Sequence, residues 1–415
     1  MIKRCVVFVF ICFLLAGCAR DPGQVNPTDT EPLGTEPTTM ELTASESMRE
    51  YNAQNKFRGI APRVTSFQET ENFFCGSGFM GEVIHYYDKV TGISGVLCAD
   101  PSCTHESSAC GAYADYGSFF CDEKGTCYWV GKDDQGEGRD YYLWTGDLAG
   151  TNQKKVKRLS FEDIIVQYQP QQYEIHRGRF YILGQNDIVD GANTYQRVIL
   201  MSYALDGTEK YATLFDKTFE LNVHPFLRFV GDSVYLTLQV FPNGGPFDMT
   251  ILKINVNTGD VEILYEESGM TESIDPVWVT EKGDIFIPGR NEENAFIWKL
   301  ESGKRVEVSR WEYSEPSCPS VFDGIAAFTY RVDGVRWIDV INISGETLYS
   351  GKMFPDDILE IDGDPNNFSF ALTGGDTEKL IVNLQNFTGT GLTDYTILLD
   401  LNENLKPTIL WVTHR

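Results

Sequence analysis

Apolar and polar residues alternate in short runs along most of the chain, and the runs are separated by turns rich in glycine or asparagine. This alternation indicates half-buried β-strands, because successive side chains of a strand point to opposite faces. Glycine and asparagine tolerate the positive φ that tight hairpins need. One such turn recurs about every 40 to 60 residues, at residues 87–92, 145–150, 204–207, 254–259, 298–303, 340–345 and 399–404.

A second hairpin precedes each of these turns. Lys124-Gly125 stands before the β-rich run 127–130, and Arg177-Gly178 stands before the run 180–183. Two hairpins per repeat give four strands, which is typical of a propeller blade. The pattern therefore predicts an all-β fold, a β-propeller of seven four-stranded blades over residues 63–415. Six blades, eight blades or a pair of sandwiches remain as alternatives, and the pattern does not predict how the ring closes.

The N-terminus has the composition of an export signal. Lys3 and Arg4 precede an apolar run over residues 5–15, which is too short to span a bilayer as a helix. The run ends in Leu15-Ala16-Gly17-Cys18, which resembles the bacterial lipobox. That resemblance implies a signal peptide over residues 1–17 and a lipid, such as palmitate, attached through Cys18. An ordinary signal peptide that happens to contain a cysteine is the alternative.

The segment after Cys18 predicts a tether. Residues 19–44 are rich in Pro, Thr, Glu and Gly, so they lack the apolar surface needed to offset the entropy of ordering. We therefore expect residues 18–62 to be a lipidated cysteine and a disordered spacer. The chain has 60 acidic and 34 basic residues and a net charge of -26, which argues against nucleic acid as a partner. The predicted location is the extracytoplasmic face of the cell membrane, with the lipid as the membrane contact.

Six of the ten cysteines lie between residues 75 and 127. Cys98, Cys103, His105 and Cys110 follow one another as Cys-x4-Cys-x-His-x4-Cys, a ligand set that zinc accepts in tetrahedral geometry. Export to an oxidising compartment favours disulfides instead, and Cys121 and Cys127 could pair across a hairpin. We favour structural disulfides and expect no cofactor. A zinc site at the first four residues and unpaired thiols in an anaerobic habitat remain as alternatives.

Two short patterns carry a resemblance to known families. The repeats are similar to those of TolB-like and YWTD-type propellers, with Leu143-Trp144-Thr145-Gly146-Asp147 the nearest match to the second type. The segment from Cys98 to His105 resembles a Cys-x-Asp-Pro-x-Cys-x-His pattern of lipoprotein propellers from anaerobic Firmicutes. The resemblance implies family membership and no particular activity.

The motif search identifies no catalytic residues. The chain has no Gly-x-Ser-x-Gly, no His-Glu-x-x-His and no phosphate-binding Gly-x4-Gly-Lys-Ser/Thr. We therefore favour a non-enzymatic binding or scaffolding module for an unknown protein, peptide or glycan. The alternative is an envelope polysaccharide hydrolase or lyase with carboxylates at the channel mouth, which a cluster of acids with one Arg at the ring centre would favour. A metal-dependent role of the loop from Cys98 to Cys110 is a third possibility.

Overall fold

The computed structural model describes most of the chain after residue 66. The described residues are 67–77, 83–105, 110, 112–113, 119–121, 126–132, 141–147, 151–159, 172–190, 193–206, 211–220, 222–242, 246–312, 319–354, 361, 363–388 and 391–414. The predicted signal peptide, Cys18 and the tether lie outside this part. No helix among the described residues is long and apolar enough to cross a membrane.

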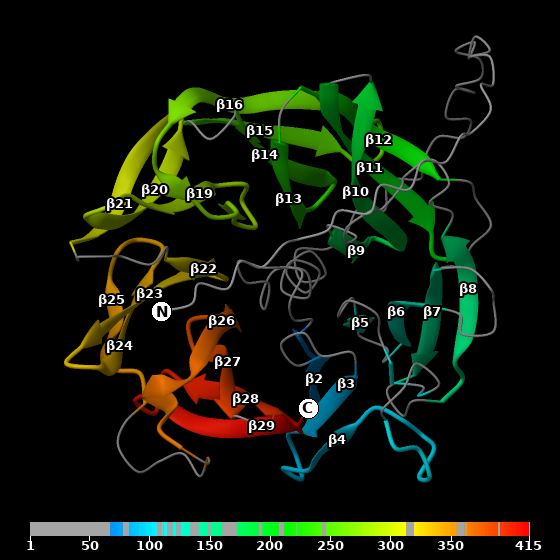
Figure 1. The fold of residues 1–415 in the computed structure, drawn as a ribbon, viewed down its shortest axis with the longest axis vertical. Coiled ribbons are helices and arrows are strands. Elements are labelled where there is room, and N and C mark those ends of the chain that lie inside the picture. The colour runs from blue at the N-terminus through cyan, green and yellow to red at the C-terminus, as the bar shows by residue number, and fades with distance from the viewer. Residues whose placement is uncertain are drawn as a thin grey trace, which may run out of the picture. The chain divides into compact units, whose positions relative to one another are not determined.

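Seven antiparallel sheets form the blades of a β-propeller, which confirms the predicted fold and blade number (Figure 1). Each blade is built from strands that are consecutive in the sequence. Blades 1 to 3 contain β1 (Phe67–Glu69), β2 (Phe73–Ser77), β3 (Ile84–Asp88) and β4 (Ser94–Val96); β5 (Phe119–Cys121), β6 (Thr126–Lys132), β7 (Tyr141–Asp147) and β8 (Lys154–Leu159); β9 (Gln172–His176), β10 (Arg179–Asp190), β11 (Asn193–Ala204) and β12 (Ala212–Phe219).

Blades 4 to 7 continue the ring, and one short 3-10 helix, η2 (Pro365–Asn367), precedes the last of them. Their strands are β13 (Asn222–Val230), β14 (Ser233–Phe241), β15 (Phe247–Asn255) and β16 (Val261–Met270); β17 (Ser273–Ile274), β18 (Trp278–Val279), β19 (Ile285–Arg290), β20 (Asn294–Glu301) and β21 (Lys304–Glu312); β22 (Ser320–Phe322), β23 (Ile325–Val332), β24 (Val335–Asn342) and β25 (Thr347–Lys352); β26 (Ser369–Gly375), β27 (Lys379–Thr388), β28 (Gly391–Asp400) and β29 (Lys406–His414).

Burial within a blade depends on the position of each strand. The second strand of blade 4, β14, is buried on both faces over most of its length, whereas the outer strand β16 is largely exposed. The inner strands lie between neighbouring blades, so that each interface forms its own apolar core. Leu183 and Val198 of blade 3, for example, share a cluster with Val223 and Leu236 of blade 4. The core of the propeller is therefore a series of blade-to-blade layers.

Among the described residues the ring closes without a shared strand. β29 is the outer strand of its own blade, beside β28, so blades 7 and 1 meet there through side chains. The Trp411 ring stacks on Phe67 at 5.8 Å and on His85 at 5.9 Å between ring centroids. Glu69 Oε1 accepts hydrogen bonds from Nζ of Lys89 (2.7 Å) and of Lys379 (2.8 Å). We call this contact between blades 7 and 1 the seam.

Candidate metal centre

The connection between blades 1 and 2 folds back against blade 1. Tyr113 forms an isolated antiparallel bridge with Val83, immediately before β3. The N–H of Ile84 donates to the carbonyl of Ala112 at 2.8 Å, and the N–H of Leu97 donates to the carbonyl of Ile84 at 2.9 Å. These bonds bring the end of the connection beside its beginning. Residues that are far apart along the connection therefore share one small region of space.

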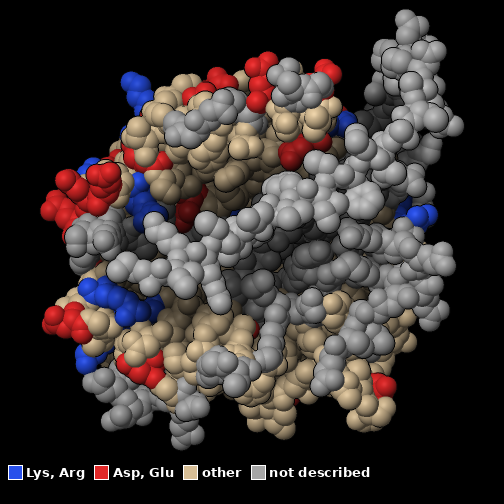
Figure 2. All heavy atoms as spheres, in the orientation of Figure 1, with Lys and Arg blue, Asp and Glu red and all other residues tan. Residues whose placement is uncertain are grey.

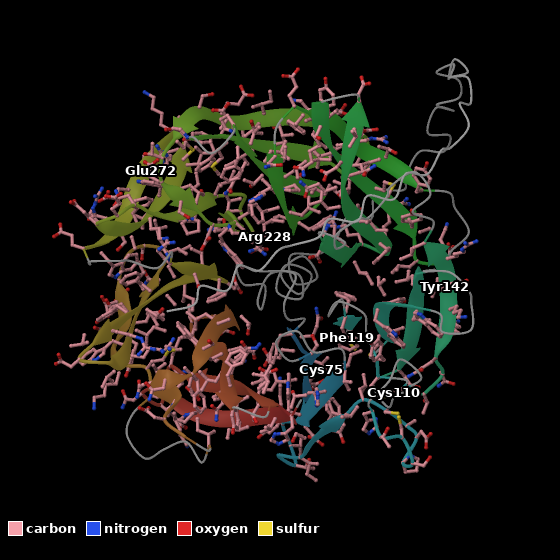
Figure 3. The ribbon with its side chains drawn as sticks, viewed as in Figure 1. Cys75, Cys110, Phe119, Tyr142, Arg228 and Glu272 are labelled. Atoms are coloured by element: carbon pink, nitrogen blue, oxygen red, sulfur yellow. The ribbon has the colours of Figure 1, made fainter. Side chains whose placement is uncertain are left out.

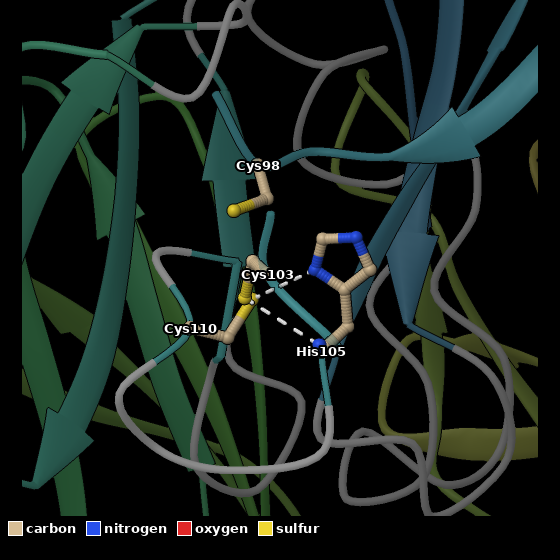
Figure 4. A group of neighbouring side chains, drawn as sticks. All are labelled: Cys98, Cys103, His105 and Cys110. Atoms are coloured by element: carbon tan, nitrogen blue, oxygen red, sulfur yellow. Dashed lines mark hydrogen bonds between the residues drawn. The ribbon is translucent and has the colours of Figure 1, made fainter. Parts of the chain in front are cut away.

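The four residues of the predicted ligand set meet in this region. One ligand atom from each of Cys98, Cys103, His105 and Cys110 lies within 4.8 Å of all the others. His105 Nδ1 is 3.3 Å from the Sγ of Cys110. Figure 4 shows the three sulfurs and the imidazole ring facing a common point. We call these residues the Cys3His cluster.

A tight turn arranges the first half of the cluster. Asp100 Oδ1 accepts hydrogen bonds from the backbone N–H of Ser102 at 2.8 Å and from its hydroxyl at 2.7 Å. Both hydrogen bonds lower the pKa of the Asp100 carboxyl, and the bond from the Ser102 hydroxyl has the larger effect. The N–H of Cys103 donates to the carbonyl of Asp100 at 3.2 Å. His105 follows with a φ of 60°. Non-glycine residues adopt this left-handed conformation infrequently, and here it occurs at one of the four residues of the cluster.

Backbone amides also point at two of the sulfurs. The N–H of His105 donates to the Sγ of Cys103, and the N–H of Ala112 donates to the Sγ of Cys110, both at 3.4 Å. Burial raises the pKa of the Cys110 thiol to about 12, and the Ala112 N–H opposes this effect. A buried thiolate is thus costly unless a cation compensates its charge. The three thiols and the imidazole can bind a soft cation, or the thiols can be oxidised to a disulfide.

A second group of thiols lies on the blade 2 side. Cys121 and Cys127 are directly opposite each other in the β5–β6 pair, and their sulfurs are 3.0 Å apart. The structure therefore brings the two residues together as expected, and a disulfide between them stays a prediction. Cys75 of β2, for which the sequence predicted no role, is fully buried in the core between blades 1 and 2, and burial raises the pKa of its thiol.

One apolar core includes cysteines of both groups. Figure 3 shows Cys75, Phe119 and Cys110 at the junction of blades 1 and 2. Leu97 and Trp129 belong to the same core, and the side chains of Cys98 and Cys103 pack against it. The six cysteines between residues 75 and 127 thus meet at one blade interface. The short spacing between Cys98 and Cys110 predicted the Cys3His cluster from the sequence. The burial of Cys75, by contrast, is known only from the fold.

Comparisons with known proteins show the fold and no more. No family model and no curated protein matches this chain. A structure from an analysis of two prolyl endopeptidases matches with a TM-score of 0.51 and 11% identity over 88% of this chain and 50% of that chain. The acylaminoacyl peptidase of Pyrococcus horikoshii matches with a TM-score of 0.49 and 12% identity, over 84% and 52%. TolB from Acinetobacter baumannii matches with a TM-score of 0.36 and 13% identity, over 83% and 78%.

This chain spans about half the length of the two peptidases that it matches. At these identities the likeness extends to the propeller and not to an activity. The sheets of this chain show a seven-bladed propeller, while its relation to a particular propeller family and to lipoproteins stays a prediction.

Proposed function

We propose that this chain is a lipid-anchored propeller on the extracytoplasmic face of the cell membrane, which binds a protein, peptide or glycan. Anchoring follows from the lipobox-like residues Leu15-Ala16-Gly17-Cys18. The observation that supports a binding role is the hairpin formed by β10 and β11. Within the described residues, this hairpin pairs beyond both neighbouring strands of its own blade.

The β10–β11 hairpin pairs continuously from Arg179↔Ala204 to Asp190↔Asn193. Its neighbours stop earlier, because β9 pairs only as far as Leu183 and β12 only as far as Gln196. Within the described residues, the end of the hairpin is thus a two-stranded ribbon with no strand beside it. The backbone N–H and C=O groups on the outer edges of this ribbon can pair with a strand of a bound partner.

The tip of this ribbon also carries apolar side chains. Val189 is 71% exposed and Ile188 is 37% exposed, with Asp187 and Asp190 beside them. A projecting, partly apolar hairpin flanked by charged residues is a suitable contact surface, because loops and hairpin ends carry most recognition on rigid scaffolds. Elsewhere, Figure 2 shows acidic side chains along the outer rim over β16 and β21, which favours solubility.

The inner strands give less support to the hydrolase form of the alternative, a polysaccharide hydrolase or lyase. Glycoside hydrolases use two carboxylates about 5 to 9.5 Å apart. The acidic residues on the described inner strands are Glu69 of blade 1 and Glu174 of blade 3, which are not adjacent blades. Glu69 is engaged by two lysines. Arg228, labelled in Figure 3, donates from Nε to the carbonyl of Val277 at 3.2 Å and lies 5.2 Å from the Trp278 ring.

The binding role can be tested with the full-length protein in detergent on arrays of envelope glycans and peptides. We expect the double variant Ile188→Asp, Val189→Asp to lose at least 10-fold in affinity for the captured ligand. Val90→Asp is the matched control, because Val90 is 79% exposed on the β3–β4 turn of another blade. Equal binding by all three proteins would remove the hairpin from the proposal.

Anchoring needs a separate measurement. We expect radiolabelled or alkyne-tagged palmitate to be incorporated into the wild-type chain expressed in bacteria, and Cys18→Ala to abolish both labelling and membrane retention. Labelling of the variant would show that the lipid is attached elsewhere, and absence of label in the wild type would show that the segment is an ordinary signal peptide.

A further inference from the structure

We propose that Cys98, Cys103, His105 and Cys110 bind one zinc ion, which fastens the connection after blade 1 to the interface between blades 1 and 2. The proposal concerns the stability of the propeller and does not depend on what the propeller binds. Three observations support the proposal. They are the convergence of the four side chains, the hydrogen bonds from backbone N–H groups to two of the sulfurs, and the position of the cluster in the fold.

The convergence matches tetrahedral zinc. Bonds of about 2.3 Å to sulfur and 2.0–2.1 Å to nitrogen place the ligand atoms roughly 3.5 to 3.8 Å apart. In the structure all four ligand atoms lie within 4.8 Å of one another, and His105 Nδ1 is 3.3 Å from the Sγ of Cys110. Only movements of about 1 Å or less are needed to reach the bound geometry. Three thiolates and an imidazole are a ligand set that selects zinc over harder cations.

A disulfide accounts for fewer of these features. A disulfide within the cluster would use two of the three sulfurs, leaving the third sulfur and the imidazole of His105 without a reason to converge. Cys121 and Cys127 show the simpler arrangement that suits a disulfide, since they are two residues opposite each other in a hairpin. The expectation that disulfides dominate in this segment therefore fits Cys121 and Cys127 better than it fits the Cys3His cluster.

The two backbone hydrogen bonds to sulfur also support a bound cation. The N–H groups of His105 and Ala112 lie 3.4 Å from the sulfurs of Cys103 and Cys110 and direct positive partial charge at them. Hydrogen bonds of this kind stabilise the charged form of an acidic group and are weak for a neutral thiol. They form the outer shell that holds metal ligands in place.

The place of the cluster indicates a structural role. All four positions would be filled by protein, which is characteristic of closed structural zinc sites rather than catalytic ones. Cys110 lies in the core that also contains Leu97 of blade 1 and Trp129 of blade 2. Blade 1 has strands of only three, five, five and three residues. Small cores are commonly supplemented by a metal or a disulfide.

The test uses the full-length protein extracted in detergent without chelator or reductant. We expect one zinc per chain by inductively coupled plasma mass spectrometry. Cys98, Cys103 and Cys110 should be alkylated only after a chelator is added. Replacement of zinc by Co²⁺ should give the intense visible bands of tetrahedral cobalt bound to thiolates. These three measurements on the wild type do not depend on whether any variant folds.

Variants then locate the site. Cys103→Ser and His105→Gln should weaken zinc binding by more than about 100-fold, because changes to outer-shell residues alone cost about 10- to 100-fold. Cys121→Ser is the matched control, since it makes the same chemical change in the same core outside the ligand set, and it should retain the zinc. A disulfide between two cluster sulfurs in the chain as extracted would overturn the proposal. So would a reduced wild-type chain that takes up no zinc, or zinc retained equally by all three variants.

Discussion

Blades 1 and 4 show two ways in which one ring holds a blade. Blade 4 has strands of nine, nine, nine and ten residues, and its ladders pair almost without interruption. As far as the chain is described, the strands of blade 1 are five residues long at most, and β4 pairs with β3 over three residues. Blade 4 is thus held largely by its own backbone hydrogen bonds and core.

Blade 1 depends more on what lies on either side of it. The Cys3His cluster and its core connect it to blade 2, and the Trp411 stack and the Glu69–Lys379 ion pair connect it to blade 7. A short blade can therefore keep its place in a propeller when contacts across both of its interfaces replace long strand ladders. We expect damage to these contacts to destabilise blade 1 before it destabilises blade 4.

The largest effect is expected from removing the proposed zinc. Chelation should abolish hydrogen-exchange protection in β1–β4, because metal binding and local folding are coupled. Protection of β13–β16 should change little. Hydrogen exchange followed by mass spectrometry measures both blades in one sample. Equal loss in the two blades would mean that the ring unfolds as a single unit, and no loss would mean that blade 1 needs no metal.

Trp411→Ala should follow in size. The ring is 3% exposed and packs on both Phe67 and His85. Its loss leaves a cavity at the seam, and we expect a destabilisation of about 3–5 kcal/mol in urea unfolding. Val412→Ala, in the same strand but 36% exposed, should cost less than about 1 kcal/mol. A small effect of Trp411→Ala would show that the seam is not what holds blade 1.

The seam should also be sensitive to acid. Burial, and secondarily the charge of His105, lowers the pKa of His85 to about 4, below its ordinary 6.5. Above pH 6.5 the neutral ring is accommodated fully. As pH falls from 6.5 toward 4 the unfolded chain takes up a proton that the folded chain excludes, so stability should fall by on the order of 3 kcal/mol.

The matched variant for this acid effect is His85→Phe, which retains an aromatic ring beside Trp411 and cannot be protonated. Unfolding midpoints measured between pH 7 and pH 4 should decline less steeply for the variant than for the wild type. Identical slopes would assign the acid sensitivity to other groups.

The smallest effect is expected at Glu69. Glu69→Gln leaves Lys89 and Lys379 without their shared carboxylate, although all three side chains retain some contact with solvent. We expect a loss of about 1–2 kcal/mol that shrinks in high salt. Arg310→Gln, which breaks a more exposed ion pair with Glu307 in blade 5, should cost less than about 1 kcal/mol. A loss at Glu69 no greater than that at Arg310 would show that the seam draws nothing from its charges.

The sequence predicted the blades well because their signals are local. Alternation and the turns at Gly92, Gly259 and Gly345, all of which have positive φ, are readable from a few residues at a time. The interruption between β17 and β18 also has a local cause, since Pro276 lies between them and lacks a backbone N–H.

The seam could not be predicted in the same way. Phe67 and Trp411 are at opposite ends of the propeller sequence, and neither residue differs in type from the many aromatics that pack within blades. The Cys3His cluster is an intermediate case. The spacing of its residues predicted which side chains belong to it. Their meeting at one point depends on the Val83–Tyr113 bridge, which no local sequence pattern predicts.

The seam has a mechanical consequence. The chain enters the propeller at β1 and leaves it at β29, and these two ends lie on opposite sides of the same packed contact. A pull on the chain at the start of β1 would therefore load side-chain contacts, which separate one after another, rather than a row of backbone hydrogen bonds, which must break together. If the proposed lipid anchor puts the chain under tension, the ring should open at the seam while the individual blades keep their shape.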